Sequence, residues 1–200
     1  MITTNCPHLF KKAWSLKDHG KDFDVVFNKE HPLGFRWLHT RIGTNWRMMP
    51  IQAVIGIEAL NLLDEWVKHR RMIANIYNEN LKDISGVRIT LPPKNIYHSY
   101  YKYYVFVVPS MLGGNWSRDK IMLEINKVGV PCFNTYGGEI YLEEAFNKSN
   151  LKPISRCSTA KLLGETCLQF LVHPTLEKTH IYDMTDKLSK VFSKIDHSDT

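Results

Sequence analysis

The chain has 200 residues, of which 44% are hydrophobic and 23% charged, a composition typical of a globular protein and unlike a disordered or fibrous one. It holds no apolar run near the roughly 20 residues that span a bilayer, and residues 1–8 lack the basic and apolar segments of a secretion signal. Both absences lead us to expect a cytoplasmic protein without a membrane partner. The net charge of +6 permits an anionic partner. No nucleic-acid motif accompanies the scattered basic residues, so we do not expect a nucleic acid to be the main partner.

The first fifty residues predict little regular structure. Residues 1–5 are β-like, and residues 9–18 predict a short helix that Gly20 ends. Residues 21–48 lack a clear hydrophobic period, so they predict a long connecting segment. Loops of that length are uncommon inside compact domains unless they are functional.

The clearest predicted element is a helix over residues 50–82. Pro50 suits the first turn of a helix, and apolar residues then recur at helical spacing as far as Leu81. A helix of this length would connect two domains. We therefore place a domain boundary at residues 85–86, which makes residues 1–85 one part and residues 86–200 a small α+β domain.

The second half of the chain predicts alternating strands and helices. Its strongest strand signal is the aromatic and β-branched run over residues 99–108. Ser117 and Thr175 are in positions to cap two amphipathic helices. The other predicted strands cover residues 87–91, 130–133 and 167–172, and short helices are predicted over residues 139–146 and 158–163.

Cysteine and histidine give no metal or disulfide pattern. The four cysteines, Cys6, Cys132, Cys157 and Cys167, form no C-x-x-C pair, which predicts reduced thiols. None of the 9 histidines has a zinc-ligand spacing. We predict no metal site.

Several segments, in one consistent order, carry a family resemblance. Residues 13–20 (AWSLKDHG), 41–56 (RIGTNWRMMPIQAVIG), the strand at 98–108 and residues 164–174 (GETCLQFLVHP) resemble signatures of the DegT/StrS-type sugar aminotransferases. Residues 129–146 look like a subgroup associated with surface-polysaccharide gene sets. The resemblance covers nearly the whole chain.

The resemblance implies an α/β fold, that of fold-type I aminotransferases. In these terms residues 1–85 would be the end of the large domain that binds pyridoxal 5'-phosphate (PLP), with a long interdomain helix, and residues 86–200 the small domain. In the family the Schiff-base lysine lies just before a segment that Met1–Thr4 resembles. We therefore expect a truncated chain that lacks this lysine, contributes no catalytic residue, does not hold PLP by itself and is inactive alone.

The implied reaction is amination of a nucleotide-linked keto sugar in surface-polysaccharide biosynthesis, for example of lipopolysaccharide. PLP would be the cofactor and glutamate the amino donor. The implied partner is a second copy in a homodimer or a separate N-terminal half. Two alternatives stay open: a non-catalytic subunit that complements a separate N-terminal half, and a basic module that binds phosphate or nucleic acid.

The resemblance also implies site residues. Asn45 would contact the PLP phosphate across the subunit interface, because an amide donor just before a helix N-terminus suits an anion. Arg47 would bind the same phosphate or a carboxylate. Substrate contacts are implied for His98 and Tyr101, on a strand beside the active site, and for Glu139 and Tyr141, at positions that vary with substrate. Plainer alternatives stay open for four of them: a turn residue for Asn45, a salt bridge or subunit contact for Arg47, and a capping histidine and a packed strand aromatic for His98 and Tyr101.

Overall fold

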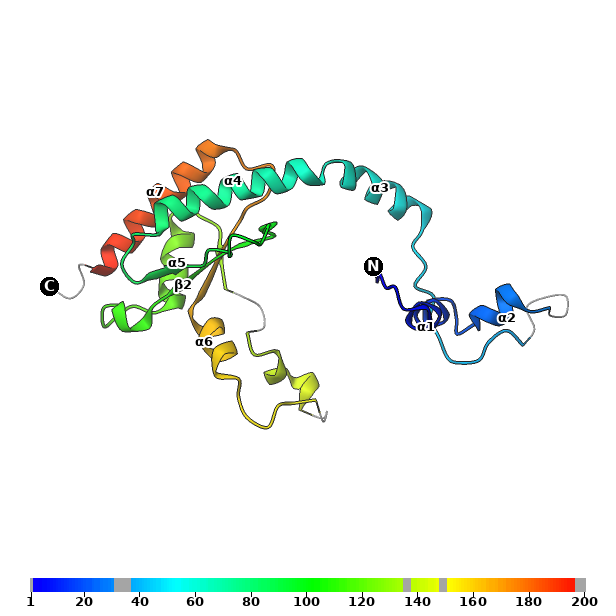
Figure 1. Cartoon of the computed structure of the whole chain (residues 1–200). Coiled ribbons are helices and arrows are strands. Elements are labelled where there is room, and N and C mark those ends of the chain that lie inside the picture. Colours follow the sequence, from blue (N-terminus) through cyan, green and yellow to red (C-terminus); the bar gives the residue numbers. More distant parts are fainter. Residues whose placement is uncertain (1, 31–36, 135–137, 148–150, 197–200) are drawn as a thin grey trace. The chain divides into compact units, whose positions relative to one another are not determined.

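The computed structural model describes residues 2–30, 37–134, 138–147 and 151–196 (Figure 1). The chain divides into two compact units, Met1–Asn61 and Leu62–Thr200. Among the described residues, no helix is both long enough and apolar enough to cross a membrane.

The first unit contains helices α1 (Pro7–Lys17), α2 (Phe23–Asn28) and α3 (Pro50–Asn61). α1 and α2 pack through four aromatic rings, Phe10, Trp14, Phe23 and Phe27, whose contacting centroids lie 4.8–5.5 Å apart. The Asp22 side chain caps α2. Its Oδ1 accepts hydrogen bonds from the backbone amides of Asp24 and Val25, at 3.0 Å each.

Two expectations for this unit are wrong. Residues 2–5 form no strand, because they have no strand partner in the described part of the chain. The segment over residues 21–48 is not all irregular, because it contains α2, which Asp22 caps. Residues 31–36 of this segment lie outside the described residues.

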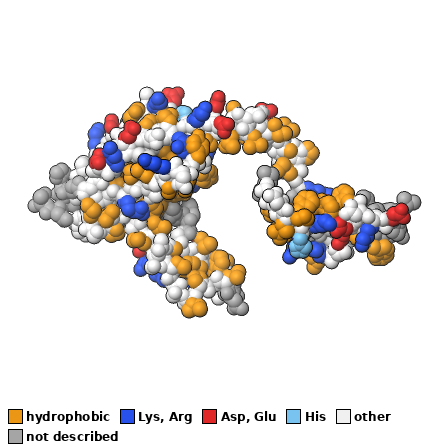
Figure 2. All heavy atoms as spheres, in the orientation of Figure 1, with side chains coloured by type: hydrophobic (Ala, Val, Ile, Leu, Met, Phe, Trp, Pro, Cys, Tyr) orange, Lys and Arg blue, Asp and Glu red, His pale blue; other side chains and the backbone are white. Residues whose placement is uncertain are grey.

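The predicted helix over residues 50–82 is interrupted at Leu62. Leu62 has φ −94° and ψ −7° and lies between α3 and α4 (Leu63–Leu81). Asp64 and Glu65 occupy the first turn of α4, where the helix dipole favours acidic side chains. None of the α3 residues is buried, so its apolar periodicity has no packing partner within the described chain. Figure 2 shows these hydrophobic side chains on the surface.

The second unit contains an antiparallel sheet in the order β1-β2-β4-β3. Its strands are β1 (Val87–Ile89), β2 (Tyr103–Val107), β3 (Cys132–Phe133) and β4 (Cys167–Phe170). Tyr103 pairs with Phe170, and Arg88 pairs with Phe106. Because β2 alternates, Tyr103, Val105 and Val107 are buried while Tyr104 and Phe106 occupy the opposite face.

Helices α4 and α5 (Arg118–Lys127) contact the sheet, and α7 (Lys178–Asp196) packs on both of them (Figure 1). The core is centred on Tyr77 of α4, whose ring stacks on Tyr103 at 4.9 Å and on Phe170 at 5.7 Å. α6 (Ser158–Thr166) contacts β2. Three short 3-10 helices span Pro109–Met111, Ile140–Leu142 and Glu144–Phe146.

Of the two predicted helix caps, one is confirmed and one is wrong. Ser117 does cap α5, since its hydroxyl accepts a hydrogen bond from the Lys120 amide at 3.2 Å. Thr175 does not cap α7, which begins at Lys178. The Thr175 hydroxyl instead contacts His173 Nδ1 at 2.8 Å, so it stabilises the turn before the helix.

The two compact units divide at residues 61 and 62, upstream of the boundary predicted at residues 85–86. α4 belongs to the second unit because it buries Ile73, Tyr77 and Leu81 in the core there. The assignment of residues 1–85 to a large domain and of residues 86–200 to a small domain concerns the intact protein and stays a prediction.

Candidate functional site

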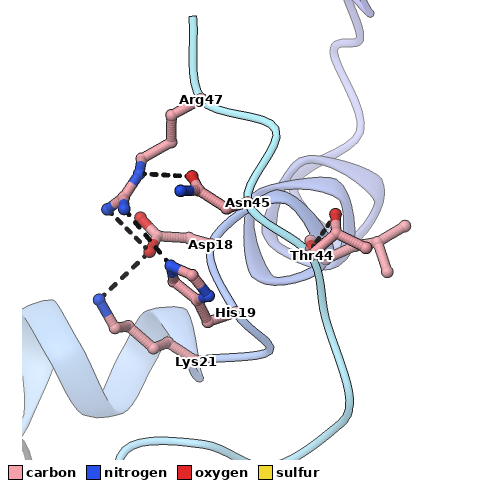
Figure 3. A network of polar contacts seen from close by, with 7 residues as sticks. Asp18, His19, Lys21, Thr44, Asn45 and Arg47 are labelled. Atoms are coloured by element: carbon pink, nitrogen blue, oxygen red, sulfur yellow. Dashed lines mark hydrogen bonds and ion pairs between the residues drawn. The ribbon is translucent and has the colours of Figure 1, made fainter.

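The candidate site lies in the first unit, where two segments that are distant in sequence lie side by side (Figure 3). The turn after α1 is hydrogen-bonded to the segment that leads toward α3. The His19 amide donates to the Thr44 carbonyl at 2.9 Å, and the Thr44 amide donates to the Leu16 carbonyl at 2.7 Å. An isolated antiparallel bridge joins Asp18 to Asn45. Backbone pairing thus places the side chains of the two segments together.

Glycine permits this close approach. Gly20 has φ +84°, and a Cβ atom there would lie 1.8 Å from the Arg41 carbonyl oxygen. Gly43 is similarly confined, because a Cβ atom there would be 2.2 Å from the Gly20 amide nitrogen. Only residues without a side chain fit at these two positions, since the obstructing atoms belong to the backbone.

The polar side chains form one network, here called the Asp18–Asn45 cluster: Asp18, His19, Lys21, Asn45 and Arg47. Arg47 is its centre. Its guanidinium donates to Asn45 Oδ1 at 3.1 Å and to Asp18 Oδ1 at 3.3 Å, and it lies 3.4 Å from His19 Nε2. Lys21 Nζ donates to the same Asp18 oxygen at 3.2 Å. One carboxylate therefore binds two cations (Figure 3).

Asp18 is ionised and largely buried. Its side chain is 12% exposed, whereas that of Arg47 is 48% exposed. Burial would raise the pKa of Asp18, but the hydrogen bond from Lys21 and the charges of Lys21, Arg47 and Lys17 hold that pKa below its ordinary value. The carboxylate is thus a fixed negative charge that orients Arg47.

Within the cluster, the Asn45 side chain keeps an accessible hydrogen-bond donor. Arg47 occupies the amide oxygen, and within the described residues no hydrogen bond engages Nδ2 (Figure 3). The residue is exposed, so this N–H donor is accessible. A neutral donor beside a partly exposed guanidinium fits a phosphate oxygen. The geometry at Asn45 and Arg47 is compatible with an anion, and their contact with the PLP phosphate stays a prediction.

The helix N-terminus contributes less than the sequence suggested. Asn45 does precede α3, which begins at Pro50, but it lies in an isolated bridge with Asp18 and not directly beside the helix N-terminus. The Met49 amide, which precedes the helix, already donates to Gln52 Oε1 at 2.9 Å. An anion at Asn45 would be bound by side chains of the cluster.

His98 and Tyr101 lie in the second unit, before β2. His98 accepts a hydrogen bond at Nδ1 from the Tyr100 amide at 3.0 Å, and its carbonyl accepts from Arg71 at 2.9 Å. Tyr101 is 75% exposed, with Lys102 Nζ 5.7 Å from its ring. Both residues are outside the regular strand and accessible; their role in substrate binding stays a prediction.

Glu139 and Tyr141 bind each other, together with Arg156 and Cys157. Arg156 donates to both carboxylate oxygens of Glu139, through Nε at 2.8 Å and through a second, shorter contact. Tyr141 donates to Glu139 at 2.6 Å and accepts from the Cys157 amide at 2.8 Å. This Glu139 cluster ties residues 139–141 to residues 156–157. The polar groups predicted to contact substrate are therefore engaged in holding the chain.

The Glu139 cluster makes a testable pH prediction. Hydrogen bonds from Arg156 and then Tyr141 lower the pKa of Glu139 from 4.5 to about 2. Because the pKa is depressed in the folded state, the ion pair stabilises the fold fully above pH 4.5. This contribution to the free energy of unfolding is lost as the pH falls through about 2. Titration of the Glu139 carboxyl carbon by NMR should show this low midpoint.

Replacing Arg156 with glutamine should return most of that shift, and Tyr141→Phe a smaller part, because Arg156 is the larger cause. A Glu139 midpoint unchanged by Arg156→Gln would show that the ion pair is absent in solution.

The structure thus brings Asn45 and Arg47 together, and Glu139 and Tyr141 together, as two separate clusters. Sequence reasoning missed Asp18, His19 and Arg156. Asp18 and His19 lie inside the quoted segment AWSLKDHG, which was the available signal. Nothing in the spacing marked Arg156. No group of three or more His, Cys, Asp or Glu side chains is arranged to hold a metal ion in the part of the chain described here.

A sequence profile of the DegT/DnrJ/EryC1/StrS aminotransferase family matches residues 1–189. Among curated proteins, an uncharacterised protein of Methanocaldococcus jannaschii is 24% identical over 196 residues, which are 97% of this chain and 50% of that protein. GDP-perosamine synthase of Escherichia coli O157:H7 is 29% identical over 101 residues, which are 50% of this chain and 24% of that enzyme.

Solved structures of aminotransferases also match this chain. An aminotransferase from Psychrobacter cryohalolentis is 40% identical with a TM-score of 0.86, and the match covers 96% of this chain and 51% of that one. Helicobacter pylori PseC, an aminotransferase involved in the biosynthesis of pseudoaminic acid, has a TM-score of 0.78 at 18% identity, over 96% of this chain and 48% of that one; this likeness shows the fold alone. The chain therefore spans about half the length of the Methanocaldococcus jannaschii protein and of these two solved structures.

Proposed function

Since the chain belongs to the DegT/DnrJ/EryC1/StrS aminotransferase family, a family of PLP-dependent enzymes with the fold-type I architecture, we propose that it is the C-terminal part of a sugar aminotransferase that acts on nucleotide-linked keto sugars. Glutamate would supply the amino group. We place the reaction in surface-polysaccharide biosynthesis, such as that of lipopolysaccharide. The GDP-perosamine synthases among its relatives support a sugar substrate.

One observation carries the proposal for the cofactor: the exposed Asn45 amide that Arg47 orients. When bound, PLP supplies an electron sink for the bond broken at the amino-bearing carbon. Asn45 Nδ2 would donate to its phosphate, and the guanidinium of Arg47 would add positive charge beside it. Asp18 would hold Arg47 in place, since the two lie 3.3 Å apart. These residues bind and orient; none of them moves a proton.

The lysine for this chemistry would come from an N-terminal half, in the same polypeptide or in a partner chain. Lys11, which is on α1, is engaged by both carboxylate oxygens of Asp24 at 2.6 and 2.8 Å. We propose that the 200-residue chain alone neither retains PLP nor transfers an amino group. Residues 1–85 would complete a large domain, and the assembled enzyme would be a dimer.

The test combines this chain with the N-terminal half of the Psychrobacter cryohalolentis aminotransferase, which is 40% identical where the two match. Glutamate-dependent amination of nucleotide-linked keto sugars, and PLP retained after desalting, are measured for the assembly and for the chain alone. We expect both properties in the assembly only.

Each part of the proposal can fail separately. Amination or PLP retention by the chain alone would refute its dependence on another half. An assembly that retains PLP and aminates simple keto acids but no nucleotide-linked sugar would refute the proposed substrate class.

A further inference from the structure

The segment that contains Glu139 and Tyr141 is held by helix α6. At the start of the helix, the amide of its N-cap residue Cys157 donates to the Tyr141 hydroxyl at 2.8 Å. Arg156, which precedes it, binds the Glu139 carboxylate, and the Glu139 side chain is only 10% exposed. The position of residues 139–141 therefore depends on the position of α6.

The same segment also packs against the side of α6. A Cβ atom at Gly138 would lie 2.6 Å from the Gly164 Cα atom and 3.1 Å from the Ala160 carbonyl oxygen. Ala160 and Gly164 are four residues apart, so they lie on one face of the helix. A side chain at Gly138 cannot be accommodated without a shift, because the atoms that it would meet belong to the helix backbone. Residue 138 is thus held close to the last turn of α6.

Arg118, the first residue of α5, fixes this end of α6. Its Nη1 donates to the Gly164 carbonyl at 2.9 Å and to the Cys167 carbonyl at 3.0 Å. The Gly164 carbonyl is one of the last four of the helix, which have no partner inside it, and the helix dipole favours a cation there. The Arg118 side chain is 12% exposed, and its Nε donates to Asp119 at 2.7 Å. The guanidinium is therefore held in one orientation.

These contacts connect the sheet to the Glu139 cluster step by step. Cys167 is the first residue of β4, so its carbonyl has a fixed position in the sheet. Arg118 joins this carbonyl to that of Gly164, and Gly164 contacts Gly138. Gly138 directly precedes Glu139 in the chain. A change at Arg118 should therefore displace the Glu139 cluster, although Arg118 is on another helix.

We propose that Arg118 is a positioning residue for the proposed reaction, because it fixes the end of α6 and thereby places Glu139 and Tyr141 for the sugar substrate. The inference rests on the proposed function, since the resemblance to sugar aminotransferases is what implies substrate contacts for these two side chains. A guanidinium suits this place because it holds several donors in a fixed geometry, whereas a lysine offers one flexible ammonium group.

The test measures the titration of the Glu139 carboxyl carbon by NMR in the 200-residue chain without PLP. In Arg118→Gln, the midpoint should rise from about 2 toward 4.5, because the segment is no longer held beside Arg156. The charges that lower the pKa of Glu139 are those of Arg156 and Lys161, so a shift caused by Arg118 reports position and not charge. The Cys157 amide, which is hydrogen-bonded within the cluster, should exchange at least about tenfold faster.

Two further variants show whether the effect is specific. Lys127→Gln is the control for charge on α5, because Lys127 pairs with Glu124 of the same helix at 2.6 Å, and it should leave the Glu139 midpoint unchanged. Arg118→Lys keeps the charge and loses the fixed donors, so its midpoint should lie between those of Arg118→Gln and the unmodified chain. Hydrogen-exchange protection of the β2 amides, equal in all variants, distinguishes a local displacement from global unfolding.

Gly138→Ala tests the next contact in the series and does not depend on the folding of Arg118→Gln. Its Cβ atom would push residue 138 away from Gly164, so the Glu139 midpoint should rise here as well. Because both substitutions interrupt the same series of contacts, their effects should not add when Gly138→Ala is combined with Arg118→Lys. Additive effects, or a Glu139 midpoint that Arg118→Lys and Arg118→Gln leave unchanged, would overturn the inference.

The assembled enzyme tests the consequence for the substrate. Arg118→Lys should raise the KM for the nucleotide-linked keto sugar about three- to tenfold and leave the KM for glutamate unchanged, because Glu139 and Tyr141 are assigned to the sugar. An equal rise in both KM values, or no rise in either, would refute the role in placing the substrate. An assembly without amino transfer would count against the proposed function, and the Glu139 midpoint of the chain alone would still decide whether Arg118 positions the cluster.

Discussion

In the Gly20→Ala variant, the two segments that carry Asp18 and Asn45 are expected to separate. The new Cβ would lie 1.8 Å from the Arg41 carbonyl oxygen, and the left-handed backbone at φ +84° disfavours any side chain. The conformational cost alone is about 1–2 kcal/mol. The clash adds to it, because the obstructing atom is in the backbone and no side chain can turn aside.

Hydrogen exchange measures this effect directly. The amides of His19 and Thr44 are hydrogen-bonded between the two segments, so both should lose protection in Gly20→Ala. Gly129→Ala is the matched control: φ is +81° there, yet a Cβ would meet nothing within 4 Å. It should cost only about 1–2 kcal/mol in its own unit. Unchanged protection of Thr44 in Gly20→Ala would show that the observed pairing is not the one in solution.

In the assembled enzyme, Asn45→Ala should lower the affinity for PLP about 10- to 150-fold. A hydrogen bond to a charged group contributes about 1.5–3 kcal/mol, and 1.4 kcal/mol corresponds to about tenfold in affinity. The substitution removes an exposed side chain and one bond to Arg47, so the fold should persist. Equilibrium dialysis of the cofactor against each variant measures the loss.

Two further variants separate binding from positioning. Asp18→Asn keeps the shape of the side chain but removes the charge that holds Arg47 and Lys21, so it should weaken PLP less than Asn45→Ala does. Asn61→Ala, at the end of α3 and outside the cluster, should have no effect on PLP affinity. If Asn45→Ala lowers only the melting temperature, Asn45 is a turn residue and the phosphate contact is wrong.

Elements whose signals are local were predicted well. The aromatic run at residues 99–108 contains β2, and Ser117 caps α5 as expected, because one side chain and the next turn define such a cap. The fold class is confirmed by the family and its solved structures. The prediction of a strand at the N-terminus was wrong, because a strand needs a pairing partner and the local sequence pattern does not show whether one is present.

The errors share a physical origin. The interruption at Leu62 depends on where packing begins, since α3 buries none of its residues while α4 buries five. The apolar spacing continues across both helices, and only the acidic pair at Asp64 and Glu65 marked a new N-terminus. The contacts of Arg47 with Asp18 and of Arg156 with Glu139 join residues far apart in sequence. Such tertiary pairs leave no local pattern.

The strand order has a consequence for how the chain folds during synthesis. β4 lies between β2 and β3, although it follows both of them in sequence. Until Cys167–Phe170 has left the ribosome, β2 has only its hairpin partner β1, and β3 has no partner strand within the described residues. The nascent chain therefore exposes the two strand edges that β4 later covers, one on β2 and one on β3, and such edges are sites for aggregation or chaperone binding. The sheet can be completed only after this inner strand has been synthesised.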